Sequence, residues 1–227
     1  MRTQLLQTLQ QAIIRWGLPK VGQVGHWRRK GFSMPAPNEV KWGVLRRWGS
    51  ADSPWVESGT YLGVTTRELA RWSPLVVSLE PDLKLFRKAE QRFRKFKNVQ
   101  IINVPSETGL AQALQSLGAH KSANFWLDGH YSSGNTFRGA QDTPVLDELS
   151  LISEAIGSGA LESTVVFIDD CRLFAAQHRE VPSDSERTGY PSLQRLVEWA
   201  SKNQFSWIIE HDIFIASSNA QLDRGLS

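Results

Sequence analysis

The stretch Trp55-Val-Glu-Ser-Gly-Thr-Tyr-Leu-Gly63 decides the fold, together with the later run Leu75-Val-Val-Ser-Leu-Glu80. An apolar run enters a glycine turn, a segment of helical length follows, and a second apolar run ends on a carboxylate. Gly59 and Glu80 lie 21 positions apart. In nucleoside-binding folds such a turn lets the backbone approach the ligand, and an acidic residue about 20 residues later accepts the ribose hydroxyls. The two runs therefore predict a nucleoside-binding unit.

The spacing within the turn narrows the class of cofactor. A dinucleotide-binding turn has the pattern Gly-x-Gly-x-x-Gly, and this pattern is absent here. The string Glu57-x-Gly59-x-Tyr61-x-Gly63 instead resembles motif I of the class I S-adenosylmethionine-dependent methyltransferases, with Tyr61 in place of the middle glycine. The resemblance implies S-adenosylmethionine as cofactor, bound by these four residues and Glu80.

Ser106 is a further candidate for the cofactor site. By analogy with the family it lines the adenine pocket together with Glu107. The alternative is that both residues cap a helix that begins near Gly109.

Apolar runs rich in β-branched residues alternate with helical segments along the chain. The runs are 54–57, 75–79, 99–104, 123–127 and 164–168. This alternation predicts a parallel sheet with helices on both faces. Residues 205–216 add two strands around a tight turn, and the resemblance implies that the last strand is antiparallel. We therefore expect an α/β, Rossmann-like, seven-stranded and mostly parallel sheet with a C-terminal antiparallel hairpin, formed by residues 51–227.

Residues 1–50 form a basic N-terminal extension in this interpretation. Residues 3–16 predict an amphipathic helix, 17–37 a loop and 38–48 a second helix. The extension contains nine Lys or Arg residues against the single acidic Glu39, whereas the whole chain has a net charge of only +3. It could bind an anionic partner such as nucleic acid, or present a solvated helical face. Its tryptophans also make it a candidate contact for a homo-oligomer.

Composition places the chain among ordinary globular proteins, with 41% hydrophobic and 22% charged residues. No apolar run approaches the roughly 20 residues of a transmembrane segment, and no secretory signal is evident. Cys171 is the only cysteine, which excludes an intrachain disulfide and suits a reducing cytosol. We expect a cytoplasmic protein.

Carboxylates follow two runs that the topology would place side by side. Asp128 ends the fourth run, and Asp169 and Asp170 end the fifth. Ligands of open α/β sheets bind at these carboxyl ends, so the three carboxylates could converge. Hard oxygen ligands suit Mg²⁺, which would bind a substrate hydroxyl and lower its pKa. The alternative is that these residues cap turns or the following helix.

The strings Asp128-Gly-His130-Tyr131 and Asp169-Asp170-Cys171 are partly similar to the Asp-Gly-Asp-Leu-Tyr and Asp-Asp-Tyr motifs of the metal-dependent macrocin-type sugar O-methyltransferases. The resemblance implies O-methylation of a hydroxyl on a small molecule or sugar, with Mg²⁺ as a candidate second cofactor. His130 is then the candidate general base beside Asp128. Two other functions stay open: a nucleic-acid methyltransferase that uses the basic extension, and a non-catalytic binding or assembly module with this fold.

Overall fold

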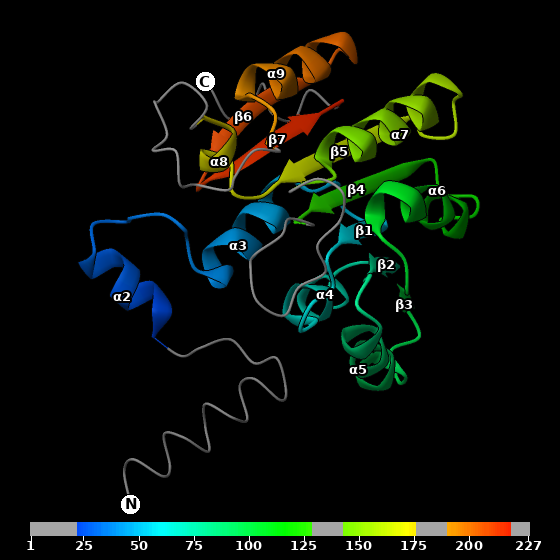
Figure 1. The fold of residues 1–227 in the computed structure, drawn as a ribbon, viewed down its shortest axis with the longest axis horizontal. Helices are drawn as coiled ribbons and strands as arrows, with labels where there is room; N and C mark the ends of the chain where they lie inside the picture. The colour runs from blue at the N-terminus through cyan, green and yellow to red at the C-terminus, as the bar shows by residue number, and fades with distance from the viewer. Residues whose placement is uncertain (1–21, 129–142, 176–189, 219–227) are drawn as a thin grey trace, which may run out of the picture.

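A computed structural model describes residues 22–128, 143–175 and 190–218 (Figure 1). The helix expected at 3–16 and the candidate base His130 lie outside these residues. The described residues form one seven-stranded sheet with the order β3-β2-β1-β4-β5-β7-β6. Its strands are β1 (Trp55–Ser58), β2 (Val76–Leu79), β3 (Val99–Ile102), β4 (Ser122–Leu127), β5 (Ser163–Ile168), β6 (Ser206–Glu210) and β7 (Ile213–Ser217).

Strands β1 to β5 pair in parallel, whereas β7 runs antiparallel to both β5 and β6. The predicted fold is therefore confirmed, including the C-terminal hairpin. His211 and Asp212 connect β6 to β7 with φ angles of 50° and 72°. Two left-handed residues at the centre of a two-residue turn match the right-handed twist of the strands that it joins.

Helices cover both faces of the sheet (Figure 1). They are α2 (Gln23–Arg29), α3 (Asn38–Trp48), α4 (Val64–Leu69), α5 (Leu83–Phe93), α6 (Ser106–Ser116), α7 (Val145–Gly157), α8 (Arg172–Ala175) and α9 (Leu193–Lys202). One buried cluster joins the sheet to α6, α7 and α9, and a second joins it to α3 and α4. Successive strand residues alternate between the clusters: Trp55 belongs to the second and Val56 to the first, as the two-residue period of a strand requires.

Two expectations need correction. Residues 17–37 were expected to form a loop, but α2 occupies Gln23–Arg29. No proline interrupts this stretch, and Trp27 anchors the segment by packing on Phe32 and on His211 of the hairpin turn. The helix expected near Gly109 begins three residues earlier, at Ser106, directly after Pro105.

The N-terminal extension packs against the sheet through α3. Val44 and Leu45 are fully buried in the same cluster as Trp55 and Leu69. Trp42 donates a hydrogen bond to Thr65 Oγ1 at 3.2 Å. The boundary at residue 50 stays a prediction, but α3 shares its core with the sheet.

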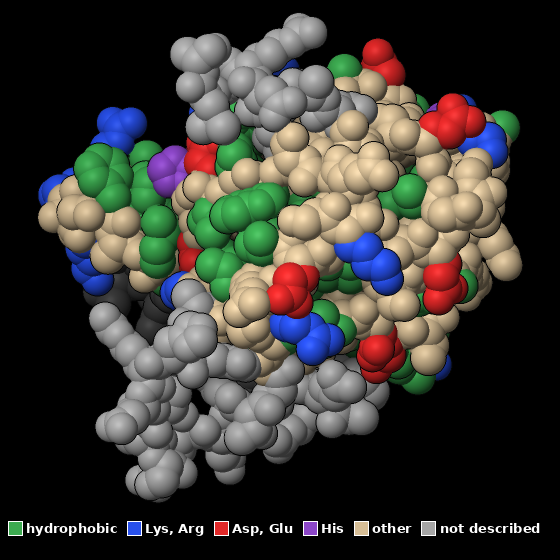
Figure 2. Space-filling view, turned by 90° about the horizontal axis from the view of Figure 1, so that it is seen from above, with side chains coloured by type: hydrophobic (Ala, Val, Ile, Leu, Met, Phe, Trp, Pro, Cys, Tyr) green, Lys and Arg blue, Asp and Glu red, His purple; other side chains and the backbone are tan. Residues whose placement is uncertain are grey.

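None of the helices in the described part of the chain is long and apolar enough to cross a membrane. On the described part of the face in Figure 2, acidic and basic side chains are interspersed. Apolar side chains gather near the middle of that view. Large exposed apolar side chains include Trp207 and Ile209 on the edge strand β6.

Candidate functional site

The glycine turn after β1 is tight, and every second residue in it is left-handed. Gly59, Tyr61 and Gly63 have φ angles of 88°, 48° and 66°. The amides of Gly59 and Thr60 both donate to the carbonyl of Leu79, at 3.0 Å each. A Cβ atom at Gly63 would lie 2.6 Å from the ring of Phe93. Tyr61 therefore adopts the conformation for which the family pattern uses glycine, an uncommon one for a side chain of this size.

Glu80 directly follows β2, and its carboxylate contacts this turn. Its Oε2 accepts a hydrogen bond from the Tyr61 amide at 2.7 Å, and its Oε1 accepts one from the Asp82 amide at 3.0 Å. Burial raises the pKa of Glu80, while these two amides oppose the increase. The structure therefore brings together the turn and the acidic residue that the sequence paired.

Glu57 lies deeper than Glu80, between β1, β2 and α4. Its Oε2 accepts hydrogen bonds from Thr66 Oγ1 at 2.5 Å and from Ser78 Oγ at 2.6 Å. Its side chain is fully buried, and this burial raises the pKa of Glu57 to about 8 in spite of the two hydroxyls. Its hydrogen-bond partners among the described residues are thus side-chain hydroxyls, whereas the family resemblance implied contact with the cofactor. Its role in cofactor binding stays a prediction.

Asp128, directly after β4, lies between Glu57 of β1 and Asp169 after β5. Its charge raises the pKa of Glu57 on one side and that of Asp169 on the other. The structure therefore brings Glu57 of β1, Asp128 after β4 and Asp169 after β5 within electrostatic reach of one another.

A lysine from the N-terminal extension lies in this cluster. The ammonium of Lys41 forms a salt bridge and hydrogen bond with Asp169 Oδ2 and lies 3.8 Å from Asp170 Oδ1. Burial lowers the pKa of Lys41, but the charges of Asp169, Asp128 and Asp170 more than offset this effect and hold it above its ordinary value. Burial and the charge of Asp128 raise the pKa of Asp169 to about 7, and Lys41 opposes this increase.

Asp170 has a second cationic partner. Arg172 Nη1 donates to Asp170 Oδ1 at 2.6 Å and also contacts Asp212 Oδ2 in the hairpin turn. Asp170 has a φ angle of 54°, so the chain turns sharply after Asp169. Among the described residues, no group of three or more His, Cys, Asp and Glu side chains is arranged to hold a metal ion. The metal role of Asp128, Asp169 and Asp170 thus stays a prediction.

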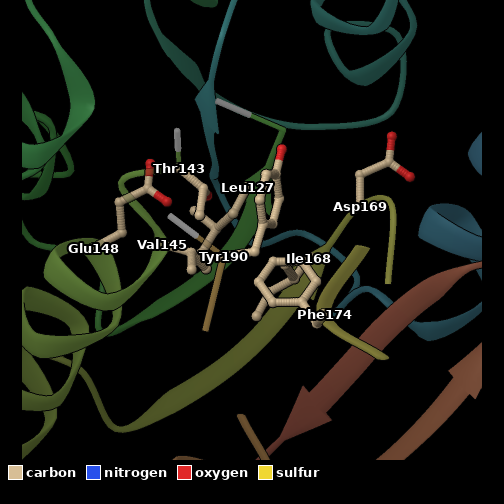
Figure 3. A pocket seen from close by; sticks show the side chains of 8 residues that line it. All are labelled: Leu127, Thr143, Val145, Glu148, Ile168, Asp169, Phe174 and Tyr190. Atoms are coloured by element: carbon tan, nitrogen blue, oxygen red, sulfur yellow. The ribbon is translucent and has the colours of Figure 1, made fainter. Parts of the chain in front are cut away.

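A small pocket opens beside Asp169, at the carboxyl ends of β4 and β5 (Figure 3). Its apolar lining consists of Leu127, Val145, Ile168 and Phe174. Its polar lining consists of Thr143, Glu148, Asp169 and Tyr190. In Figure 3 the carboxyl groups of Glu148 and Asp169 lie on either side of the Tyr190 ring. The surface that the pocket exposes is mainly polar.

Each of the two carboxyl groups in this pocket has one buried oxygen without a hydrogen-bond partner among the described residues. These oxygens are Glu148 Oε1 and Asp169 Oδ1. Burial raises the pKa of Glu148 to about 7, and the hydroxyls of Ser106 and Ser58 oppose the increase. Ser106, expected near adenine, thus contacts Glu148 of α7. A buried polar atom without a partner is costly, so these two oxygens mark a place where a ligand can donate hydrogen bonds.

Lys41 and Glu148 are the residues that sequence analysis missed. Each occupies the buried side of an amphipathic helix: Lys41 precedes Val44 and Leu45, and Glu148 precedes Leu149 and Ile152. Charged residues are rarely buried without a partner or a function. Both could have been found from the sequence, because each is a charged residue at a position where the helical periodicity predicts an apolar one.

No protein-family model matches the sequence, and no curated protein matches it. Solved structures do match its fold. A putative caffeoyl-CoA O-methyltransferase from Staphylococcus aureus is 14% identical, with a TM-score of 0.55, and the match covers 86% of this chain and 90% of that one. A precorrin-6y C5,15-methyltransferase from Geobacter metallireducens is 12% identical, with a TM-score of 0.50 and coverages of 80% and 89%.

A putative methyltransferase from Streptococcus mutans, solved in complex with SAH, is 16% identical, with a TM-score of 0.47 and coverages of 82% and 98%. The chain has the fold of the class I S-adenosylmethionine-dependent methyltransferases, as the resemblance of its glycine turn predicts.

Proposed function

We propose that this protein is an S-adenosylmethionine-dependent methyltransferase that methylates a hydroxyl group of a small molecule or sugar. The observation that carries the proposal is the position of Glu80. Its carboxylate lies at the end of β2 and against the left-handed turn of Gly59 and Gly63. This is the place where a class I fold receives the ribose of the cofactor.

The residues present fit the cofactor. The glycine turn keeps side chains away from the backbone, and Glu80 offers a carboxylate for two hydroxyls. The carboxylates of Glu80 and Asp128 favour a cationic ligand over a pyrophosphate, which they would repel. When bound, S-adenosylmethionine supplies an electrophilic methyl group attached to a positively charged sulfur.

A hydroxyl group of the acceptor would enter the pocket between β4, β5 and α7, which has room for about one water molecule. Asp169 Oδ1 and Glu148 Oε1 would accept hydrogen bonds from the hydroxyls of the acceptor, which aligns the reacting oxygen and excludes water from it. These features support an acceptor that presents hydroxyl groups to this end of the sheet.

The contacts of the basic extension support this acceptor over nucleic acid. Three of its cationic side chains are used within the protein itself. Lys41 pairs with Asp169, Arg47 pairs with Glu210 at 2.7 Å, and Arg46 lies 5.8 Å from the ring centre of Trp72. Cations held in this way contribute less to a phosphate-binding surface.

Isothermal titration with S-adenosylhomocysteine tests the cofactor assignment. We expect binding by the natural protein and about 100-fold weaker binding by Glu80→Ala, because two charge-assisted hydrogen bonds are lost. Glu80→Gln, which keeps the shape of the side chain, should lie between the two. Glu90→Ala, an exposed glutamate on α5, is the matched control and should bind like the natural protein.

Circular dichroism must first show that each variant is folded, since Glu80 also accepts two backbone amides. Absence of binding by the natural protein would contradict the proposed enzyme. Equal affinity in a folded Glu80→Ala variant would contradict only the ribose assignment. Transfer of a labelled methyl group to a panel of sugars, phenols and short RNAs would then identify the class of acceptor.

A further inference from the structure

The position of Lys41 departs most from what the sequence predicts. The three carboxylates at the strand ends suggested a divalent metal ion. Among the described residues, however, the cation beside them is the ammonium group of Lys41. Lys41 is only 9% exposed, and its ammonium contacts Asp169 and lies near Asp170. A positive charge of the chain thus already pairs with two of the carboxylates that a metal ion would require.

The residues present do not fit a divalent ion while Lys41 is in place. Mg²⁺ needs carboxylate oxygens at about 2.0–2.1 Å in octahedral geometry. Asp169 Oδ2 already accepts the Lys41 ammonium, and Asp170 Oδ1 already accepts Arg172 at 2.6 Å. A metal ion would therefore have to displace two salt bridges and approach a buried ammonium, and the repulsion between like charges is strong at such a site.

The backbone that presents Lys41 is held at several points. Val44 and Leu45, one turn further along α3, are fully buried in the core. Near the end of the helix, Trp48 Nε1 donates to Glu210 Oε2 at 2.6 Å. The position of Lys41 is thus a consequence of how α3 packs against the sheet.

We propose that Lys41 is the resident cation of the acceptor site and takes the place of a divalent metal ion. Its ammonium holds Asp169 through Oδ2. Asp169 Oδ1 and Glu148 Oε1, which belong to two residues that line the pocket, have no hydrogen-bond partner among the described residues. The N-terminal extension therefore supplies a positioning residue for the acceptor. The assignment of the cation stands independently of the cofactor; only its use for an acceptor rests on the proposed function.

Binding of Mn²⁺ to the full-length protein, followed by electron paramagnetic resonance, tests this assignment without any activity assay. We expect the natural protein to leave Mn²⁺ free at concentrations up to about 1 mM, a range typical of weak oxygen-ligand sites. Lys41→Ala should gain one Mn²⁺ site because it uncovers the carboxylates. Adding Asp169→Asn to Lys41→Ala should remove that site again.

Two further variants keep the test sharp. Lys41→Met preserves the length of the side chain and should gain the same site if Lys41→Ala does not fold. Lys84→Ala, an exposed lysine on α5, is the control and should behave like the natural protein. Binding of Mn²⁺ by the natural protein that Asp169→Asn abolishes would overturn the proposal. So would a folded Lys41 variant that gains no site. Neither result depends on whether S-adenosylhomocysteine binds.

Discussion

The two halves of the strand-end cleft are built in different ways. In the half formed by β1 and β2, Glu80 is held by backbone amides and Glu57 by hydroxyls, from residues that lie within 21 positions of them. In the half formed by β4 and β5, Asp169 is held by Lys41, which lies 128 positions away. One half is assembled from its own strand–turn–helix unit, and the other from distant segments.

The halves also differ in how completely their carboxyl groups are satisfied. Both oxygens of Glu80 accept a backbone amide. Asp169 and Glu148 each keep one buried oxygen that has no partner among the described residues. A preformed half suits a ligand that is always the same, whereas unsatisfied oxygens suit a ligand that completes the site when it binds. This difference is what we expect of a shared cofactor and a specific acceptor.

The largest effect should come from the backbone of the preformed half. We expect Gly63→Ala to lower the free energy of unfolding by about 3 kcal/mol. A left-handed alanine costs roughly 1–2 kcal/mol, and overpacking against Phe93 adds about 1–3 kcal/mol. Urea denaturation measures the change, and titration with S-adenosylhomocysteine should show weaker binding by the variant.

Gly118→Ala is the matched control for this change. Gly118 also has a left-handed φ angle, of 61°, but no atom lies within 4 Å of the position that its Cβ would take. It should cost only about 1–2 kcal/mol, the conformational part of the effect. Equal losses in the two variants would mean that Phe93 moves aside and that the turn is less tightly packed than its geometry indicates.

An intermediate effect should appear in the pH dependence of stability. It should come from two buried glutamates, Glu57 in one half of the cleft and Glu148 in the other. Burial raises the pKa of Glu57 to about 8 and that of Glu148 to about 7, from an ordinary value of 4.5. Above pH 4.5 the unfolded chain releases protons that the folded protein keeps. Each group therefore makes the folded state less stable as the pH rises from 4.5 to its folded pKa.

Melting temperatures at pH 5 and pH 8 measure this effect. Glu57→Gln and Glu148→Gln stay neutral, so each variant should gain stability relative to the natural protein between pH 5 and pH 8, by several degrees. The gain should continue to about pH 8 for Glu57→Gln and level off near pH 7 for Glu148→Gln. A constant difference between variant and natural protein at every pH would show that the glutamate is already ionised at pH 5.

The half that the sequence predicted well is the local one. The apolar runs, the turn and the carboxylate at the end of β2 are separated by little more than 20 residues, and their periodicity identifies strand, turn and helix directly. Tyr61 at the place of the middle glycine did not disturb the turn, because it adopts the left-handed conformation. The hairpin was predicted from two apolar runs rich in β-branched residues, one on each side of His211 and Asp212.

The other half could be predicted only in part. Asp128, Asp169 and Asp170 were located by the rule that ligands bind at the carboxyl ends of parallel strands. Their partners depend on how α3 and α7 pack, which no local pattern reports. Lys41 was counted among the charges of a basic extension, where a solvated position is the usual interpretation, and the packing of Val44 and Leu45 buries it instead.

The smallest effect should come from the contacts that hold α3 against the edge strand β6. Their loss tests whether the half of the cleft formed by β4 and β5 depends on this attachment. Trp48 and Arg47 both donate to the carboxylate of Glu210. Trp48→Phe should cost about 1 kcal/mol, the usual contribution of one hydrogen bond. Arg47→Ala should cost less, because its side chain is 60% exposed and surface ion pairs contribute little. Urea denaturation in low and in 1 M salt separates the two, since screening should remove the effect of Arg47 and leave that of Trp48. If both effects vanish in salt, the attachment of α3 at this edge is mainly electrostatic, and the position of Lys41 then depends on the buried residues Val44 and Leu45.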